Sequence, residues 1–98
     1  MSYTMLNRVR NRRADILRLA RKNKIGNVMV FGSCARGEER ADSDIDFLVT
    51  FEDGASLLNQ VHMRDDLQEL FGKPVDVVSS RGLSPYVGAH ILAEAVPL

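Results

Sequence analysis

The sequence predicts a small α/β (α+β) domain in which a mixed β-sheet is flanked by helices. Three short runs rich in Val, Ile and Phe have the length of strands, and longer segments around them carry apolar residues at helical spacing. The predicted order is helix, strand, short helix, strand, helix, strand, helix, with the helices on one side of the sheet. At 98 residues the chain is expected to form one domain spanning residues 1–98.

The N-terminal segment predicts an amphipathic helix from about Thr4 to Lys22, because its apolar residues recur at helical spacing between arginines. Thr4 and Ser2 are the two candidates for its N-cap. Arg12 and Arg13 interrupt the apolar stripe, so the pattern is compatible with a bend at that point.

The middle of the chain predicts two strands joined by a short helix. Val28–Phe31 is a continuous apolar run, which is typical of a strand covered on both faces. A short helix is expected at Ala35–Glu39, followed by a polar loop over Arg40–Ser43. The next strand is predicted at Asp44–Thr50.

The second half of the chain predicts a long helix and a third strand. Ser56 is a candidate N-cap for a helix that runs to about Phe71, and Gly72 ends it. The third strand is expected at Val75–Val78. Asp76 and Val78 would then face one side of the sheet and the flanking valines the other.

The C-terminal segment predicts a last helix and an apolar end. Ser84-Pro85 suits a helix start, because proline at the first helical position gives up an N–H group that has no partner there. The end, residues 95–98, is apolar. It is expected either to cover an edge of the domain or to bind another chain.

Charge is balanced overall but distributed unevenly. The formal net charge is zero, yet residues 1–24 hold eight Arg or Lys against the single acid Asp15, a local balance of +7. Such a patch can suit RNA, nucleotide phosphates or an acidic protein surface. It can equally be the solvated face of a helix.

The number of cysteines and the lengths of the apolar runs exclude several classes of protein. With one cysteine, an internal disulfide is excluded, and the chain has no Cys/His cluster for zinc. That residue, Cys34, is expected to be a small buried hydrophobe. No apolar run approaches 18 residues, so a soluble, cytoplasmic protein is expected.

Two carboxylates stand at the start of the second predicted strand. Residues two apart in a strand share a face, so Asp44 and Asp46 would converge while Ile45 and Phe47 take the other side. Converging carboxylates repel each other, and a divalent cation removes that repulsion. Oxygen ligands without His or Cys point to Mg²⁺, which completes its shell with water and substrate phosphates.

A glycine and a serine follow directly after the first predicted strand. Gly32 would let a backbone approach a phosphate closely, and a helix starting at or just after Ser33 would aim N–H groups at an anion. Ser33 is also a candidate cap for that helix. Phosphate binding beside a metal site indicates nucleotide chemistry.

These residues stand at a recognisable spacing. Gly32-Ser33, ten intervening residues and then Asp44-x-Asp46 resembles the G-S-x10-D-x-D signature of the polymerase β-type nucleotidyltransferase superfamily. The fuller run Gly-Ser-x-Ala-Arg-Gly followed by Asp-Ser-Asp-Ile-Asp is similar to its smallest branch, the minimal nucleotidyltransferases (MNT). That family uses a third carboxylate on a later strand, and Asp76 fits this position.

The resemblance implies a polymerase β-like fold and a set of site residues. Two Mg²⁺ ions would be held by Asp44, Asp46 and Asp76, which are also the implied catalytic residues. Gly32 and Ser33 would cradle the β- and γ-phosphates of a nucleoside triphosphate, most simply ATP.

A basic residue accompanies the implied phosphate site. Arg36 is a candidate nucleotide-binding residue, because its guanidinium could contact the triphosphate. It could instead pair with Glu38, Glu39 or Asp42, which follow it closely in the sequence.

The resemblance also implies a protein acceptor. Minimal nucleotidyltransferases commonly act as antitoxins beside a HEPN-type ribonuclease and transfer AMP to a tyrosine of that toxin. Two other functions stay open: a non-catalytic antitoxin that masks its partner by binding, and a transferase that acts on a small molecule or an RNA end.

Overall fold

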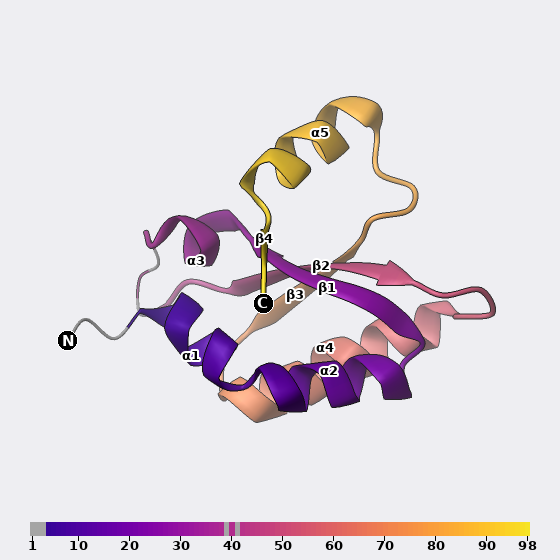
Figure 1. The fold of residues 1–98 in the computed structure, drawn as a ribbon, viewed down its shortest axis with the longest axis horizontal. Helices are drawn as coiled ribbons and strands as arrows, with labels where there is room; N and C mark the ends of the chain where they lie inside the picture. The colour runs from indigo at the N-terminus through magenta and orange to yellow at the C-terminus, as the bar shows by residue number, and fades with distance from the viewer. Residues whose placement is uncertain (1–3, 39, 41) are drawn as a thin grey trace.

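The computed structural model describes residues 4–38, 40 and 42–98 (Figure 1). The strands of this part of the chain are β1 (Ile25–Phe31), β2 (Ile45–Phe51), β3 (Val75–Ser79) and β4 (Val96–Pro97). The helices are α1 (Met5–Asn11), α2 (Arg13–Lys22), α3 (Gly32–Arg36), α4 (Leu57–Phe71) and α5 (Pro85–Glu94).

The strands form one mixed sheet in the order β3-β2-β1-β4. β2 and β3 run parallel, whereas β1 is antiparallel to both of its neighbours, β2 and β4. The predicted fold class, a small mixed sheet with flanking helices, is confirmed.

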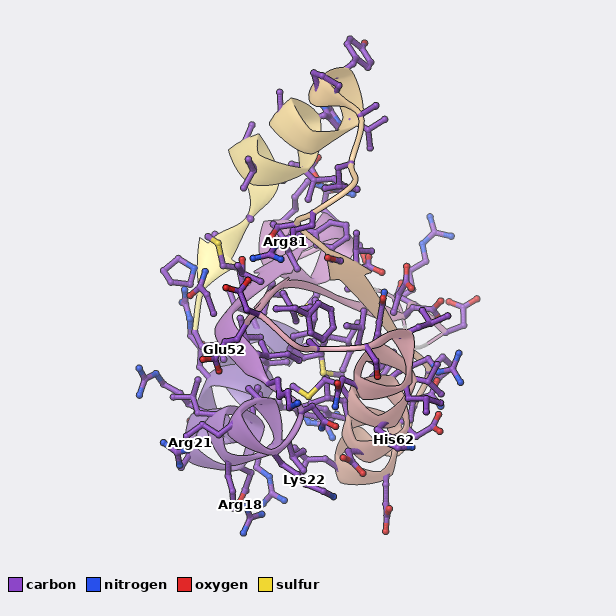
Figure 2. The ribbon with its side chains drawn as sticks, turned by 90° about the vertical axis from the view of Figure 1, so that its right-hand side faces the viewer. Arg18, Arg21, Lys22, Glu52, His62 and Arg81 are labelled. Atoms are coloured by element: carbon purple, nitrogen blue, oxygen red, sulfur yellow. The ribbon has the colours of Figure 1, made fainter. Side chains whose placement is uncertain are left out.

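The two faces of the sheet are covered unequally (Figures 1 and 2). Helices α1, α2 and α4 lie on one face, and α5 stands off the other. The expectation that the helices share one side is therefore wrong for α5. Because α5 connects β3 at one sheet edge with β4 at the opposite edge, it has to cross the sheet, and α2 and α4 already occupy the other face.

The hydrophobic core lies between the sheet and the helices α2 and α4. The rings of Phe47 and Phe71 stack within it with their centroids 6.2 Å apart. Cys34 is fully buried, as predicted. The core cluster also contains Val9, Ile16, Ala20, Ile25, Val28, Val30, Ile45, Val49, Met63, Leu67, Val75 and Val77.

The strand β1 is covered less evenly than its sequence suggests. It begins three residues before the predicted Val28, and its buried side chains alternate with half-buried ones over Val28–Phe31. The predicted cover on both faces is therefore only partial: one face of Val28–Phe31 is buried and the other is half-buried. The reason is that α5 leaves much of the second face open.

Several predicted helix ends are confirmed by their hydrogen bonds. The Thr4 hydroxyl accepts from the Asn7 N–H at 3.2 Å and caps α1, while Ser2 lies outside the described residues. The Ser56 N–H donates to the Asn59 side chain at 2.8 Å within a capping box that starts α4. At the other end of α4, Gly72 adopts the left-handed φ of +65°.

The basic N-terminal segment forms two helices rather than one. Arg12 separates α1 from α2, so the bend occurs where the apolar stripe is interrupted. Figure 2 shows Arg18, Arg21 and Lys22 pointing away from the sheet. Arg18 pairs with Asp15 at 3.2 Å and Lys22 pairs with an α4 carboxylate at 3.6 Å, so part of the positive charge is neutralised within the chain.

The C-terminal segment closes one edge of the sheet. Val96 and Pro97 pair with Val30 and Met29 of β1, and the Arg10 guanidinium donates to the Pro97 carbonyl at 3.0 Å. Of the two predicted roles for this segment, covering a domain edge is thus confirmed. In the part of the chain that the structure describes, no helix combines the length and apolarity needed to cross a membrane.

Candidate active site

Strand register brings two of the predicted acids together. β2 and β3 are parallel, and Asp46 is the direct partner of Asp76 in their register. The residues flanking them on both strands are buried toward the helices, so the two carboxylates share the open face, as alternation predicts. Asp44 lies just before β2, and its side chain is exposed, like that of Asp76.

A tight backbone approach places Gly32 against the same acids. Phe31, the last residue of β1, is the register partner of Asp46, so the chain turns directly beside that carboxylate. Gly32 has a left-handed φ of +75°, and a Cβ built there would collide with an Asp46 carboxylate oxygen. The left-handed φ favours glycine here, and any side chain would also have to displace the Asp46 carboxylate.

The acids influence one another electrostatically. The pKa of Asp46 is raised to about 6 from an ordinary value of 3.8, mainly by its partial burial and then by the charges of Asp76 and Asp44, in that order. Arg36 opposes them and lowers that pKa. The shift shows that all three carboxylates and the guanidinium act on one small region of the open face.

The helix α3 begins earlier than predicted. It starts at Gly32 rather than at Ala35, because the left-handed glycine turns the chain as soon as β1 ends, and Glu39 lies outside the described residues. Phe31 is the N-cap and supplies no side-chain hydrogen bond, so the expectation that Ser33 caps this helix is wrong. Within the described residues, the half-buried Ser33 hydroxyl makes no hydrogen bond and remains available to a ligand.

Arg36 is held by two carboxylates. Its Nε donates to Glu38 at 3.1 Å, which is one of the predicted pairings, and its Nη1 donates to Glu94 at 2.9 Å. The hydrogen bond to Glu38 and the charge of Glu94 raise the pKa of the Arg36 side chain. Sequence reasoning missed Glu94, because it lies 58 positions away on α5 and no local pattern marks it.

The donor set suits a hard cation bound together with a substrate. Among the described residues, no group of three or more His, Cys, Asp or Glu is arranged to hold a metal ion by itself. Mg²⁺ does not need such a cage, because it usually takes one or two carboxylates plus water and phosphate oxygens. The adjacent carboxylates of Asp46 and Asp76, whose repulsion a cation would relieve, fit that chemistry.

Comparison with known proteins identifies the family. The family model described as polymerase beta, nucleotidyltransferase, matches residues 14–98. The chain is 41% identical to a candidate protein adenylyltransferase of Methanocaldococcus jannaschii, over 83% of this chain and 87% of the relative. It is 39% identical to the protein adenylyltransferase MntA of Thermococcus cleftensis, over 74% of this chain and 73% of that protein.

Solved structures agree with the sequence relatives. A candidate minimal nucleotidyltransferase is 45% identical and superposes with a TM-score of 0.86 over the whole of both chains. A toxin–antitoxin complex with AMP-PNP contains a chain of the same fold, with a TM-score of 0.74 at 24% identity, over 86% of this chain and 69% of that one. With Gly32-Ser33 beside Asp44-x-Asp46 on the matched fold, this chain belongs to the polymerase beta nucleotidyltransferase family and is a minimal nucleotidyltransferase.

Proposed function

We propose that this enzyme is an antitoxin that transfers AMP from ATP to a tyrosine hydroxyl of a HEPN-type toxin. Two kinds of relative support the proposal. MntA of Thermococcus cleftensis is named a protein adenylyltransferase. A structure of the same fold, at 21% identity and a TM-score of 0.67, is described as a tri-AMPylated Shewanella oneidensis HEPN toxin with its MNT antitoxin.

One observation carries the assignment of the site. Asp46 is flanked by Asp76 in the register of β2 and β3 and by the β1 end that leads into Gly32. Carboxylates for a cation and a backbone that can approach a phosphate therefore meet at one point. Nucleotidyl transfer needs both at once, because positioning and charge neutralisation supply most of its rate.

The acids are assigned to metal binding. Asp44 and Asp46 would hold two Mg²⁺ ions, and Asp76 would share the ion on the acceptor side. When bound, Mg²⁺ supplies charge neutralisation at the α-phosphate and the leaving group. Asp76 would in addition lie where it favours loss of the acceptor's hydroxyl proton.

The nucleotide is assigned to the turn after β1. Gly32 and Ser33 would contact the β- and γ-phosphates, and the Arg36 guanidinium would add a positive charge beside them. The acceptor oxygen would form a bond to the α-phosphorus as the bond to the bridging oxygen breaks. Pyrophosphate would leave with the charge that these groups neutralise.

The test is transfer of label from α-labelled ATP to a co-purified HEPN toxin in the presence of Mg²⁺. We expect labelled toxin, an added adenylyl mass on one tyrosine, and loss of both with a chelator. The variant Asp44→Asn with Asp46→Asn should abolish transfer. A matched control, Asp65→Asn with Glu69→Gln, removes two exposed carboxylates from α4 on the far face and should keep full activity.

The same variants separate catalysis from masking. If the double Asn variant labels the toxin as well as the unchanged protein does, the transferase assignment is wrong. If it fails to label the toxin but still protects co-expressing cells fully, binding alone neutralises the toxin and the antitoxin role does not depend on transfer.

A further inference from the structure

Arg36 has only part of its guanidinium committed within the chain. Nε donates to Glu38 at 3.1 Å and Nη1 to Glu94 at 2.9 Å. Nη2 has no hydrogen-bond partner among the described residues. Two carboxylates thus fix the plane of the guanidinium and leave both N–H groups of Nη2 for a ligand.

The two carboxylates are not equivalent. The Glu38 side chain is 67% exposed, whereas the Glu94 side chain is 25% exposed. Ion pairs in full contact with solvent fix a side chain weakly, because water competes for both partners. The Glu94 contact is shorter and more sheltered, so water competes less for it than for the Glu38 contact.

The Glu94 contact reaches from α5 to the acid site. Arg36 is on α3 and its charge lowers the pKa of Asp46, so the guanidinium lies within electrostatic range of that carboxylate. Glu94 ends α5, the helix that stands off the open face (Figure 1). One hydrogen bond therefore links that helix to the site.

The fold does not depend on this link. The segment after α5 is already anchored, because β4 pairs with β1 and the Pro97 carbonyl accepts from Arg10. Glu94 can therefore be changed without releasing the end of the chain.

We propose that Glu94 is a positioning residue for nucleotide binding, which holds the Arg36 guanidinium so that Nη2 faces the triphosphate. This inference rests on the proposed function and names a residue of α5 that acts on the same site. Glu94 touches no reacting atom. The same Glu94 oxygen lies 3.7 Å from His90 Nε2 on α5, a longer contact, and the proposed effect on the site passes through Arg36.

Binding and steady-state kinetics on the full chain test the inference. For Glu94→Ala we expect the ATP Kd and KM to rise about five- to tenfold, with kcat changed less than twofold, because the arginine is retained but no longer oriented. Glu94→Gln keeps a carbonyl oxygen that can accept from Nη1, so it should recover part of the affinity. Glu69→Ala removes an exposed α4 carboxylate and should leave Kd, KM and kcat unchanged.

A double-mutant cycle shows whether Glu94 acts through Arg36. Arg36→Ala alone should weaken ATP binding at least as much as Glu94→Ala. The combined variant should bind no more weakly than Arg36→Ala, because the residue to be positioned is already gone. Additive losses would overturn the inference.

The outcomes distinguish this inference from the proposed function. If the unchanged protein binds no ATP, the proposed function fails and the role of Glu94 falls with it. If Arg36→Ala weakens ATP binding while Glu94→Ala binds ATP normally or more tightly, the transferase assignment stands and the positioning role is refuted. Should Glu94→Ala fold poorly, Glu94→Gln, which keeps the volume of the side chain, decides the question. A smaller rise in KM with kcat unchanged supports the positioning role, and an unchanged KM refutes it.

Discussion

The two faces of the sheet differ in what they contribute to the protein. The face under α1, α2 and α4 is apolar and buried throughout. The opposite face carries the acids of β2 and β3, and its helix α5 leaves Tyr86 and Leu92 87% and 58% exposed. The comparison indicates that the face under α1, α2 and α4 supplies most of the free energy of folding. The face with the acids is less buried, and its charged groups stay accessible to solvent.

The largest expected effect is on the buried face. Phe47→Ala removes a fully buried ring that stacks on Phe71, and it should lower the free energy of unfolding by about 3–5 kcal/mol. Urea denaturation followed by circular dichroism measures it. A loss below about 1 kcal/mol would contradict the division between the faces.

The next effect tests the backbone where the two faces meet. Gly32→Ala should lower the free energy of unfolding by about 2–3 kcal/mol, because it adds a collision with Asp46 to the strain of a left-handed φ. Gly72→Ala is the matched control. Its φ is also left-handed, but a Cβ there meets nothing within 4 Å, so only about 1 kcal/mol is expected. Equal losses would show that closeness to Asp46 is unimportant.

A smaller effect of opposite sign is expected at the acids. The pKa of Asp46 is raised from 3.8 to about 6 in the folded protein, so ionisation of this carboxylate destabilises the fold. The destabilisation is complete above about pH 6 and decreases as the pH falls toward 3.8. Asp46→Asn should therefore stabilise the protein by about 1 kcal/mol at neutral pH, a value reduced for solvent screening of a partly exposed group. The gain should vanish toward pH 4.

Denaturation of both proteins between about pH 4 and 7 measures that difference. Ser33→Ala removes a neighbouring group that does not titrate, so its difference from the unchanged protein should stay constant with pH. A gain from Asp46→Asn that is the same at every pH would mean that the raised pKa of Asp46 is not its cause.

The smallest effect is expected on α5. Tyr86→Ala removes a side chain that is 87% exposed, so the free energy of unfolding should change by less than about 0.5 kcal/mol. Thermal unfolding of Tyr86→Ala and Phe47→Ala, measured side by side, compares the loss of an aromatic ring on each face of the sheet. A large loss at Tyr86 would show that α5 packs more closely than its exposure indicates.

Local signals in the sequence predicted most of the secondary structure. Thr4, Ser56 and Gly72 mark helix ends through contacts within a few residues, so their patterns suffice to place those ends. The side of the sheet on which α5 lies is different. It depends on β3 and β4 forming opposite edges, and strand order is a property of the whole chain.

In the candidate site, too, some features follow from local sequence and others depend on the whole fold. Asp44, Asp46 and the glycine turn follow from spacing along one stretch, and alternation in β3 places Asp76 on the correct face. Neither the contact between Arg36 and Glu94 nor the burial that contributes most to the raised pKa of Asp46 could be predicted. Both require the distances between elements that packing alone determines.

The buried thiol of Cys34 can be used to measure how often α3 opens. It is the single cysteine, it lies in α3 beside Ser33, and no part of it reaches solvent. A reagent such as a maleimide can react only while α3 is detached from the sheet, so the labelling rate counts those openings. A nucleotide seated against this helix would slow the reaction, and occupancy could be followed without a partner protein or radioactivity.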